Sequence, residues 1–189
     1  RWHRKTECDR CRMFQQQTAG LPPQDTPEIM EADLADLAFD LASWGVDDPA
    51  RMAFLDLPPA PAWKEARQLL LNLEAIDAHG SLTPIGRIMR QLPLSPRHAH
   101  MVVEAARHGE GEAAARLAML LSERGLGGNI PDLAQRLERF ATEGGARAVA
   151  ARRLARSLVE GLPAGNTDGE PLSTGAILSL AWPERIARR

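Results

Sequence analysis

A chain of 189 residues with a formal net charge of −2 can form one large domain or two small ones, and its total charge does not indicate a nucleic-acid-binding protein. It is rich in Ala, Leu and Arg, has no Tyr and four Phe, and contains few β-branched residues, so we expect a mainly α fold. Two cysteines, no signal-peptide pattern and no apolar run of the ~18–20 residues that span a bilayer argue against a disulfide scaffold and a membrane partner, and predict a cytoplasmic protein.

The charges are unevenly distributed along the chain. Residues 25–48 contain eight acids and no Lys or Arg, whereas residues 136–156 contain six arginines and two acids. The balanced total therefore hides an acidic first helix and a basic later one.

The N-terminal residues, 1–25, are polar and lack a clear periodicity, which predicts a connector or the end of an upstream domain. They hold Cys8 and Cys11 in a lone CxxC. A zinc site needs two more ligands at suitable spacing, and we therefore expect two ordinary thiols.

Helical periodicity begins at Pro27 and continues to Trp44, where Gly45 predicts the end of the helix. A short helix is expected over 49–55. The proline cluster at 58–61 then separates it from the next helical pattern.

The stretch from residue 63 to residue 101 indicates a winged helix. Apolar residues recur at helical spacing over 63–76, residues 77–80 can turn the chain, and residues 81–83 can return it as one side of a small β-hairpin wing. Thr83 is an expected N-cap, with Pro84 at the first helical position, where its missing N–H is tolerated.

The sequence beyond Pro96 is a series of short amphipathic patterns joined by short glycine-containing connections, which predicts a helical bundle with antiparallel neighbours. Residues 162–172 are expected to form a loop. The predicted helices cover 97–108, 110–124, 131–141, 146–160 and 173–181.

No pattern in the chain predicts an active site, a metal site or a bound cofactor. His98 and His100 are two residues apart and point away from each other on a helix, so we expect them to be structural or surface histidines. The glycine-rich segment 125–128 lacks the GxxxxGK[ST] frame that binds phosphate, and we expect a loop.

The helix expected over 146–160 has two distinct faces. Leu154 and Leu158 share one face with Ala150 and Ala151.

The opposite face of this helix carries the most informative candidate site. Arg152, Arg153 and Arg156 fall together there, and Arg136 and Arg139 lie one turn apart on the preceding helix. Arginine can grip phosphate groups through its planar set of donors, which predicts a nucleic-acid-binding surface. A solvated charged face without a ligand is the alternative interpretation.

Several stretches give the chain a resemblance to the C-terminal accessory region of DEAH-type ATP-dependent helicases. Together they run in order through most of residues 26–189. They are TPEI at 26–29 with the leucine-rich helix that ends at Trp44 and Gly45, DDP at 47–49 with FLDLPP at 54–59, LTPIGR at 82–87 with LPLSPR at 92–97, and LSLAWPERIAR at 178–188, which is similar to a bacterial member of the family.

The resemblance implies a degenerate winged helix at 26–95, followed at 96–161 by a helical bundle often called the ratchet domain. Residues 162–189 would then be a loop and the start of a further C-terminal region, and residues 1–25 the end of a RecA-like motor lobe or its connector.

The resemblance also implies how such a region acts. In these helicases the accessory domains pack on the RecA-like lobes of the same chain and help enclose single-stranded nucleic acid, with RNA as the first expectation. ATP and magnesium belong to the lobes, so we expect neither a catalytic residue nor a cofactor in this region. The ratchet role favours strand contact by the arginines.

Two other functions remain open at this point. The chain can be a stand-alone winged-helix regulator that reads duplex DNA, with Arg87, Arg90 and Gln91 on the recognition helix beside a wing at His79 and Ser81. It can also be a structural scaffold that packs on other domains and binds no nucleic acid.

Overall fold

The computed structural model describes residues 26–163, 165 and 170–185, and the chain divides into two compact units, Arg1–Ala32 and Asp33–Arg189. In the first unit the described residues contain one 3-10 turn, η1 (Glu28–Met30). The connector predicted over 1–25, with Cys8 and Cys11, lies outside the described residues.

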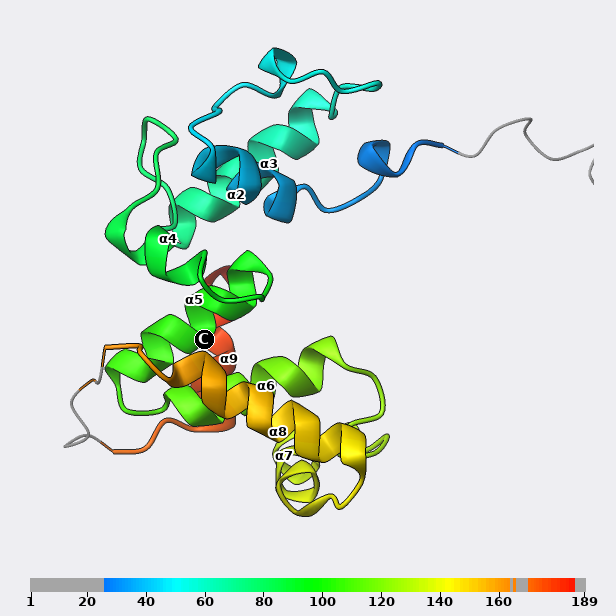
Figure 1. Cartoon of the computed structure of the whole chain (residues 1–189), viewed down its shortest axis with the longest axis vertical. Coiled ribbons are helices and arrows are strands. Elements are labelled where there is room, and N and C mark those ends of the chain that lie inside the picture. The colour runs from blue at the N-terminus through cyan, green and yellow to red at the C-terminus, as the bar shows by residue number, and fades with distance from the viewer. Residues whose placement is uncertain (1–25, 164, 166–169, 186–189) are drawn as a thin grey trace, which may run out of the picture. The chain divides into compact units, whose positions relative to one another are not determined.

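The second unit is built of helices (Figure 1), and the prediction of a mainly α fold is confirmed. In chain order the elements are α2 (Ala35–Ser43), η2 (Pro49–Arg51), α3 (Ala60–Asn72), α4 (Pro84–Met89), α5 (Pro96–Arg107), α6 (Gly111–Ser122), α7 (Leu133–Thr142), α8 (Ala146–Val159), α9 (Thr174–Ala181) and η3 (Pro183–Arg185). No helix in the described part of the chain is long and apolar enough to cross a membrane.

Local side-chain hydrogen bonds make the first two helical elements shorter than predicted. The helix expected from Pro27 begins only at Ala35, because the Asp33 carboxylate accepts a hydrogen bond from the Ala35 amide at 2.9 Å and holds the preceding backbone out of the helix. The helix expected over 49–55 is the single 3-10 turn η2. There the Asp48 carboxylate accepts from the Ala50 amide at 2.9 Å.

The segment between α3 and α4 forms a tight return. The Asp77 amide donates to the Ser81 carbonyl at 2.9 Å, and Ile76 pairs with Leu82 in an isolated antiparallel bridge. In the described residues this return contains no assigned strand, so a full hairpin wing stays a prediction.

Thr83 caps α4 as predicted, since its hydroxyl oxygen accepts from the Gly86 amide at 2.9 Å. The same hydroxyl donates to the Glu74 carbonyl, which ties the start of α4 to the end of α3. The close contact between α4 and the Ala75 backbone requires a glycine at position 86. A Cβ atom on this residue would lie 1.9 Å from the Ala75 carbonyl oxygen, so α4 packs directly on that backbone.

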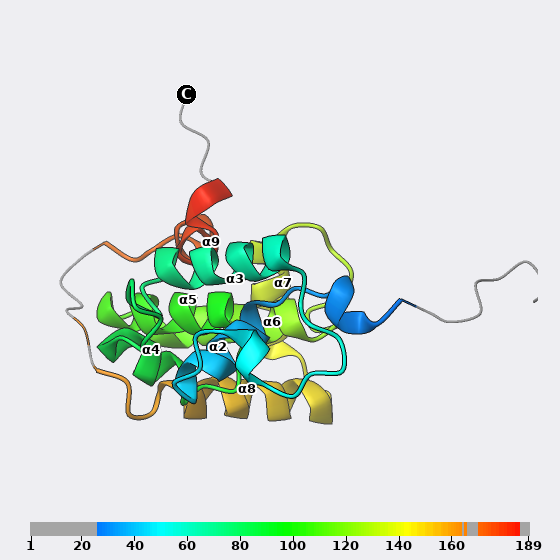
Figure 2. The same ribbon diagram turned by 90° about the horizontal axis from the view of Figure 1, so that it is seen from above.

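Helix α5 joins the two halves of the second unit. It contacts α2 and α4 on the winged-helix side, and α6 and α9 on the bundle side. Met101 and Val102 of α5 are fully buried, as are Leu117 and Leu120 of α6. Figure 2 shows α8 and α9 on opposite sides of the layer that α5 and α6 form.

The expectation of antiparallel neighbours is wrong for α7 and α8. Helix α8 packs mainly on α6, and Figure 1 shows α7 almost end-on beside an α8 that runs across the view. The two elements meet instead through single side chains, such as Arg152 of α8 and Phe140 of α7.

Helix α9 is held on α5 by three polar contacts. Arg97 donates to the Ala181 carbonyl at 2.8 Å and forms an ion pair with Glu184 at 2.8 Å, and Nδ1 of His100 lies 2.8 Å from the Leu180 carbonyl. The contacts with Ala181 and Leu180 satisfy carbonyl groups at the C-terminal end of α9, which have no partner within the helix. His100 is thus a structural histidine, as expected.

Candidate nucleic-acid interface

Helix α8 buries a narrow side made mostly of alanines. Its buried side consists of Ala148, Ala151, Ala155 and Leu158, whereas Leu154 is 42 % exposed. The small alanine side chains let the α8 backbone approach α6 closely, and this approach fixes the rotation. The four residues that share one face in the sequence pattern are thus divided, since Ala151 and Leu158 are buried and Ala150 and Leu154 are exposed.

The Arg152 side chain points inward, toward Phe140 of α7. Its guanidinium donates to the Phe140 carbonyl at the end of α7, and the guanidinium carbon lies 5.7 Å from the centre of the Phe140 ring. Phe140 is itself fully buried. The pair combines a hydrogen bond with a cation–π contact, and so holds α8 against α7.

Arg136 has a similar internal role. Its Nη2 donates to the Leu126 carbonyl at 3.1 Å, and its Nε is buried without a hydrogen-bond partner among the described residues. A Cβ atom on Gly127 would lie 2.3 Å from the Arg136 carbonyl oxygen, so the 125–128 loop lies directly on α7. The expected loop is confirmed, and Arg136 fixes its position.

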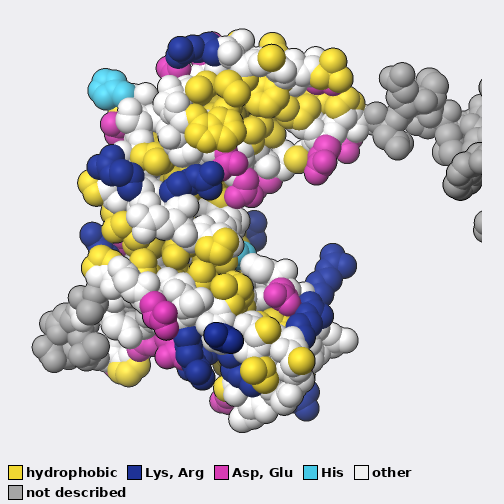
Figure 3. Space-filling model, viewed as in Figure 1, with side chains coloured by type: hydrophobic (Ala, Val, Ile, Leu, Met, Phe, Trp, Pro, Cys, Tyr) yellow, Lys and Arg dark blue, Asp and Glu magenta, His cyan; other side chains and the backbone are white. Residues whose placement is uncertain are grey.

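The other three predicted arginines are exposed on α7 and α8. Arg139 and Arg153 make no ion pair within the described part of the chain. Nε of Arg156 lies 3.6 Å from a Glu112 carboxylate oxygen, and the Arg156 side chain is 65 % exposed. Figure 3 shows dark-blue side chains gathered over the part of the molecule that contains these helices.

Glu112 on α6 limits the positive charge of this surface. It accepts a hydrogen bond from Arg116 and lies near Arg156, and the hydrogen bond from Arg116 together with both positive charges lowers the pKa of Glu112. The carboxylate is therefore ionised at neutral pH and offsets part of the charge of α8. Arg147 is likewise paired, with Glu123 at 2.9 Å.

The arginines expected to read duplex DNA are engaged inside the winged-helix half. Nη1 of Arg87 donates to the Leu82 carbonyl at 3.0 Å, and Arg90 forms a 2.8 Å ion pair with Asp40. Both side chains therefore hold the end of the turn and the acidic α2 in place.

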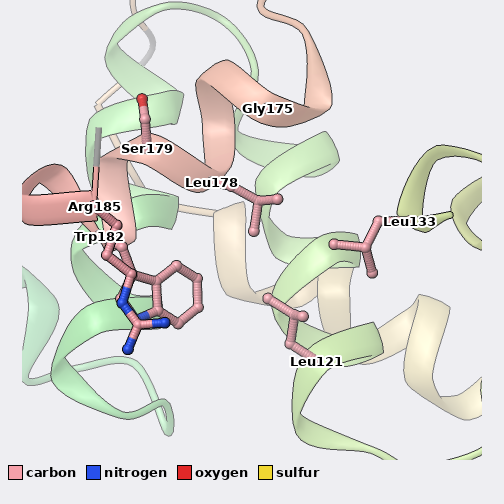
Figure 4. A pocket seen from close by; sticks show the side chains of 7 residues that line it. All are labelled: Leu121, Leu133, Gly175, Leu178, Ser179, Trp182 and Arg185. Atoms are coloured by element: carbon pink, nitrogen blue, oxygen red, sulfur yellow. The ribbon is translucent and has the colours of Figure 1, made fainter. Parts of the chain in front are cut away.

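Sequence reasoning missed a pocket of about 450 Å³ between α6, α7 and α9 (Figure 4). The one feature of the sequence that indicates this pocket is Trp182, directly after α9, and helical periodicity alone does not predict which elements this side chain contacts. Figure 4 shows the Trp182 ring and Leu178 facing Leu121 and Leu133 across the space. The lining residues are Leu121, Leu133, Gly175, Leu178, Ser179, Trp182 and Arg185.

A family model described as the helicase associated domain (HA2), winged-helix, matches residues 66–94. The chain is 32% identical over 166 residues to the ATP-dependent RNA helicase HrpB of Escherichia coli, which covers 88% of this chain and 19% of that protein. It is 38% identical over 93 residues to the ATP-dependent RNA helicase HrpA of the same organism, which covers 47% of this chain and 7% of that protein.

Solved structures give the same result. The crystal structure of the E. coli DExH-box NTPase HrpB matches 93% of this chain and 20% of its own length, with 31% identity and a TM-score of 0.70. The chain thus spans about a fifth of the length of HrpB. These matches confirm the resemblance that the sequence motifs indicate.

Proposed function

The chain resembles the helicase-associated region of DEAH-type ATP-dependent helicases, and from this premise we propose that it is the non-catalytic accessory region of an ATP-dependent RNA helicase. In this proposal residues 26–95 form a winged helix and residues 96–161 a ratchet-like bundle. They pack on RecA-like lobes of the same protein, which bind ATP and magnesium, and they help to hold and translocate a single strand.

The observation that carries the strand-binding part is the exposure of Arg139, Arg153 and Arg156 on two adjacent helices. Each guanidinium can donate to phosphate oxygens through its planar set of N–H groups. Such contacts carry no sequence information and bind any single strand, with a strong dependence on salt. Arg136 and Arg152 support the same surface from inside, since they fix the loop and the helix on which it rests.

The test removes the three exposed charges together. Arg139→Gln, Arg153→Gln and Arg156→Gln in the complete protein should weaken binding of a single-stranded RNA oligonucleotide. They should also reduce the slope of log affinity against log salt by about 2, since each phosphate contact on a single strand contributes about 0.7. Filter binding at four salt concentrations measures both quantities.

The matched control removes three cations from the winged-helix half, with Arg51→Gln, Lys64→Gln and Arg87→Gln. It lowers the net charge equally and should leave the slope unchanged. The proposed surface is contradicted if the wild type and the variant without the three exposed arginines show equal slopes of log affinity against log salt. A parallel titration with duplex DNA tests the alternative, and a loss of duplex binding in the control variant supports the regulator that reads duplex DNA.

A further inference from the structure

The pocket between α6, α7 and α9 is apolar along its walls and cationic at one end. Leu121, Leu133 and Leu178 supply the aliphatic part, and Trp182 presents its indole ring to the space (Figure 4). A volume of about 450 Å³ lies within the range of about 300–1,000 Å³ that is common for small-molecule sites.

Trp182 is held firmly as a wall of this pocket. Its ring packs edge-to-face against His98, with centroids 5.8 Å apart and an interplanar angle of 78°. Nδ1 of His98 in turn lies 3.4 Å from the Ser122 hydroxyl. The aromatic surface is therefore already in position and does not have to be ordered by a ligand.

The charge at the pocket favours an anion. Arg185 lines the space, and the neighbouring acid Glu184 turns to Arg97, with which it forms a 2.8 Å ion pair. The carboxylate is thereby neutralised, while in the described part of the chain Arg185 has no ion pair. The combination of a planar apolar wall and one cation matches a ligand that is both aromatic and anionic.

Few hydrogen-bonding groups line the pocket. The Ser179 hydroxyl donates to the Ala176 carbonyl at 2.7 Å, which uses its one proton within α9. A ligand in this space is therefore recognised by its ring faces and its charge, with little reading of its polar edges.

We propose that this pocket, which we name the Trp182 pocket, receives one base of the bound single strand, with Trp182 and the leucines against the base and Arg185 against its phosphate. This rests on the proposed function, because it gives the strand that α7 and α8 hold a second contact through a base. Stacking on aromatic side chains tolerates any base, so the pocket anchors the strand without sequence preference.

The test fills the pocket without removing a wall. Gly175 lines the pocket in the first turn of α9, and a Cβ atom added there meets nothing closer than the Ser173 hydroxyl oxygen at 4.0 Å. Gly175→Leu therefore places a side chain in the space and replaces a helix-weakening residue. The matched control is Gly144→Leu, where an added Cβ has nothing within 4 Å.

The probes are a fluorescein-labelled oligo(U) and the same strand with abasic sites, titrated against the complete protein. The wild type should bind the intact strand about five- to tenfold more tightly than the abasic strand, as expected for one stacked base. Gly175→Leu should abolish this difference and retain the salt slope, and Gly144→Leu should retain both. Trp182→Phe, which keeps an aromatic wall, should retain most of the difference.

The contrary results distinguish a failure of the proposed function from a failure of the pocket assignment. A wild type that binds neither strand contradicts the proposed function. The proposed role of the pocket is wrong if the wild type binds both strands equally, or if the Gly175→Leu protein keeps the full difference. Either result leaves the proposed surface of Arg139, Arg153 and Arg156 unaffected. If Gly175→Leu instead lowers the melting temperature of the complete protein and leaves the difference intact, a protein segment fills the pocket and the inference is wrong.

Discussion

His98 shows how a single side chain connects the chemistry of a residue to the stability of the fold. It packs against Trp182, and burial lowers the pKa of its imidazole below the ordinary value. The unfolded chain therefore binds a proton at a pH where the folded protein keeps His98 neutral, and stability falls as the pH drops through about 6.5. We expect the free energy of unfolding to decrease between pH 7 and pH 5 more in the wild type than in His98→Gln, measured by urea denaturation. His108→Gln, which changes an exposed histidine, should follow the wild type, and a His98→Gln curve parallel to the wild type contradicts the prediction.

The residues that sequence reasoning placed correctly are those whose partner is close in the chain. The Thr83 hydroxyl accepts a hydrogen bond from the Gly86 amide, only three residues further along the chain, and this contact follows from local chemistry. The sequence allowed the five arginines to be assigned to a basic surface, but it did not show which of them are exposed and which bond to the protein's own backbone. Arg152 and Arg136 bond to the carbonyls of Phe140 and Leu126, and these acceptors come into position only when the helices pack.

Among the elements, α4 is the one whose packing requires a glycine, at position 86. A Cβ atom on Gly86 would lie 1.9 Å from the Ala75 carbonyl oxygen and 3.2 Å from its Cα, and backbone atoms cannot move aside as a flexible side chain can. We expect Gly86→Ala to lower the free energy of unfolding by about 1–3 kcal/mol, the usual range for overpacking. Gly144→Ala, in open space, is the control. Urea denaturation measures both variants, and a Gly86→Ala protein as stable as this control contradicts the assigned contact.

The helices themselves were largely predictable, because the amphipathic period and the proline and glycine signals mark most of their ends. α8 begins at the predicted residue, and α5 and α9 lie within one residue of the predicted bounds. The pairing of the helices was not predictable. The place of α9 on α5 depends on Arg97 and His100, whose partners are 80 or more residues away in the sequence.

At the scale of the whole second unit, α5 is the element shared by the winged-helix half and the bundle. It contacts α2 and α4 on one side and α6 and α9 on the other, and its residues Met101 and Val102 are fully buried. A helix whose faces belong to two cores cannot unfold with one half and stay folded with the other. The boundary predicted between 95 and 96 therefore divides two structural parts that we expect to share one folding transition.

The tryptophans allow this expectation to be tested from both sides. Trp63 lies on α3 and Trp182 follows α9, so two variants that each keep one of them and replace every other tryptophan with Phe report on separate halves. In urea the two fluorescence transitions should share one midpoint and one slope, the mark of two-state unfolding. Gly86→Ala, placed in the winged-helix half, should move both midpoints by the same amount. A shift of the Trp63 transition alone would show that the halves unfold independently, and α5 would then be a tether between two domains instead of a shared core.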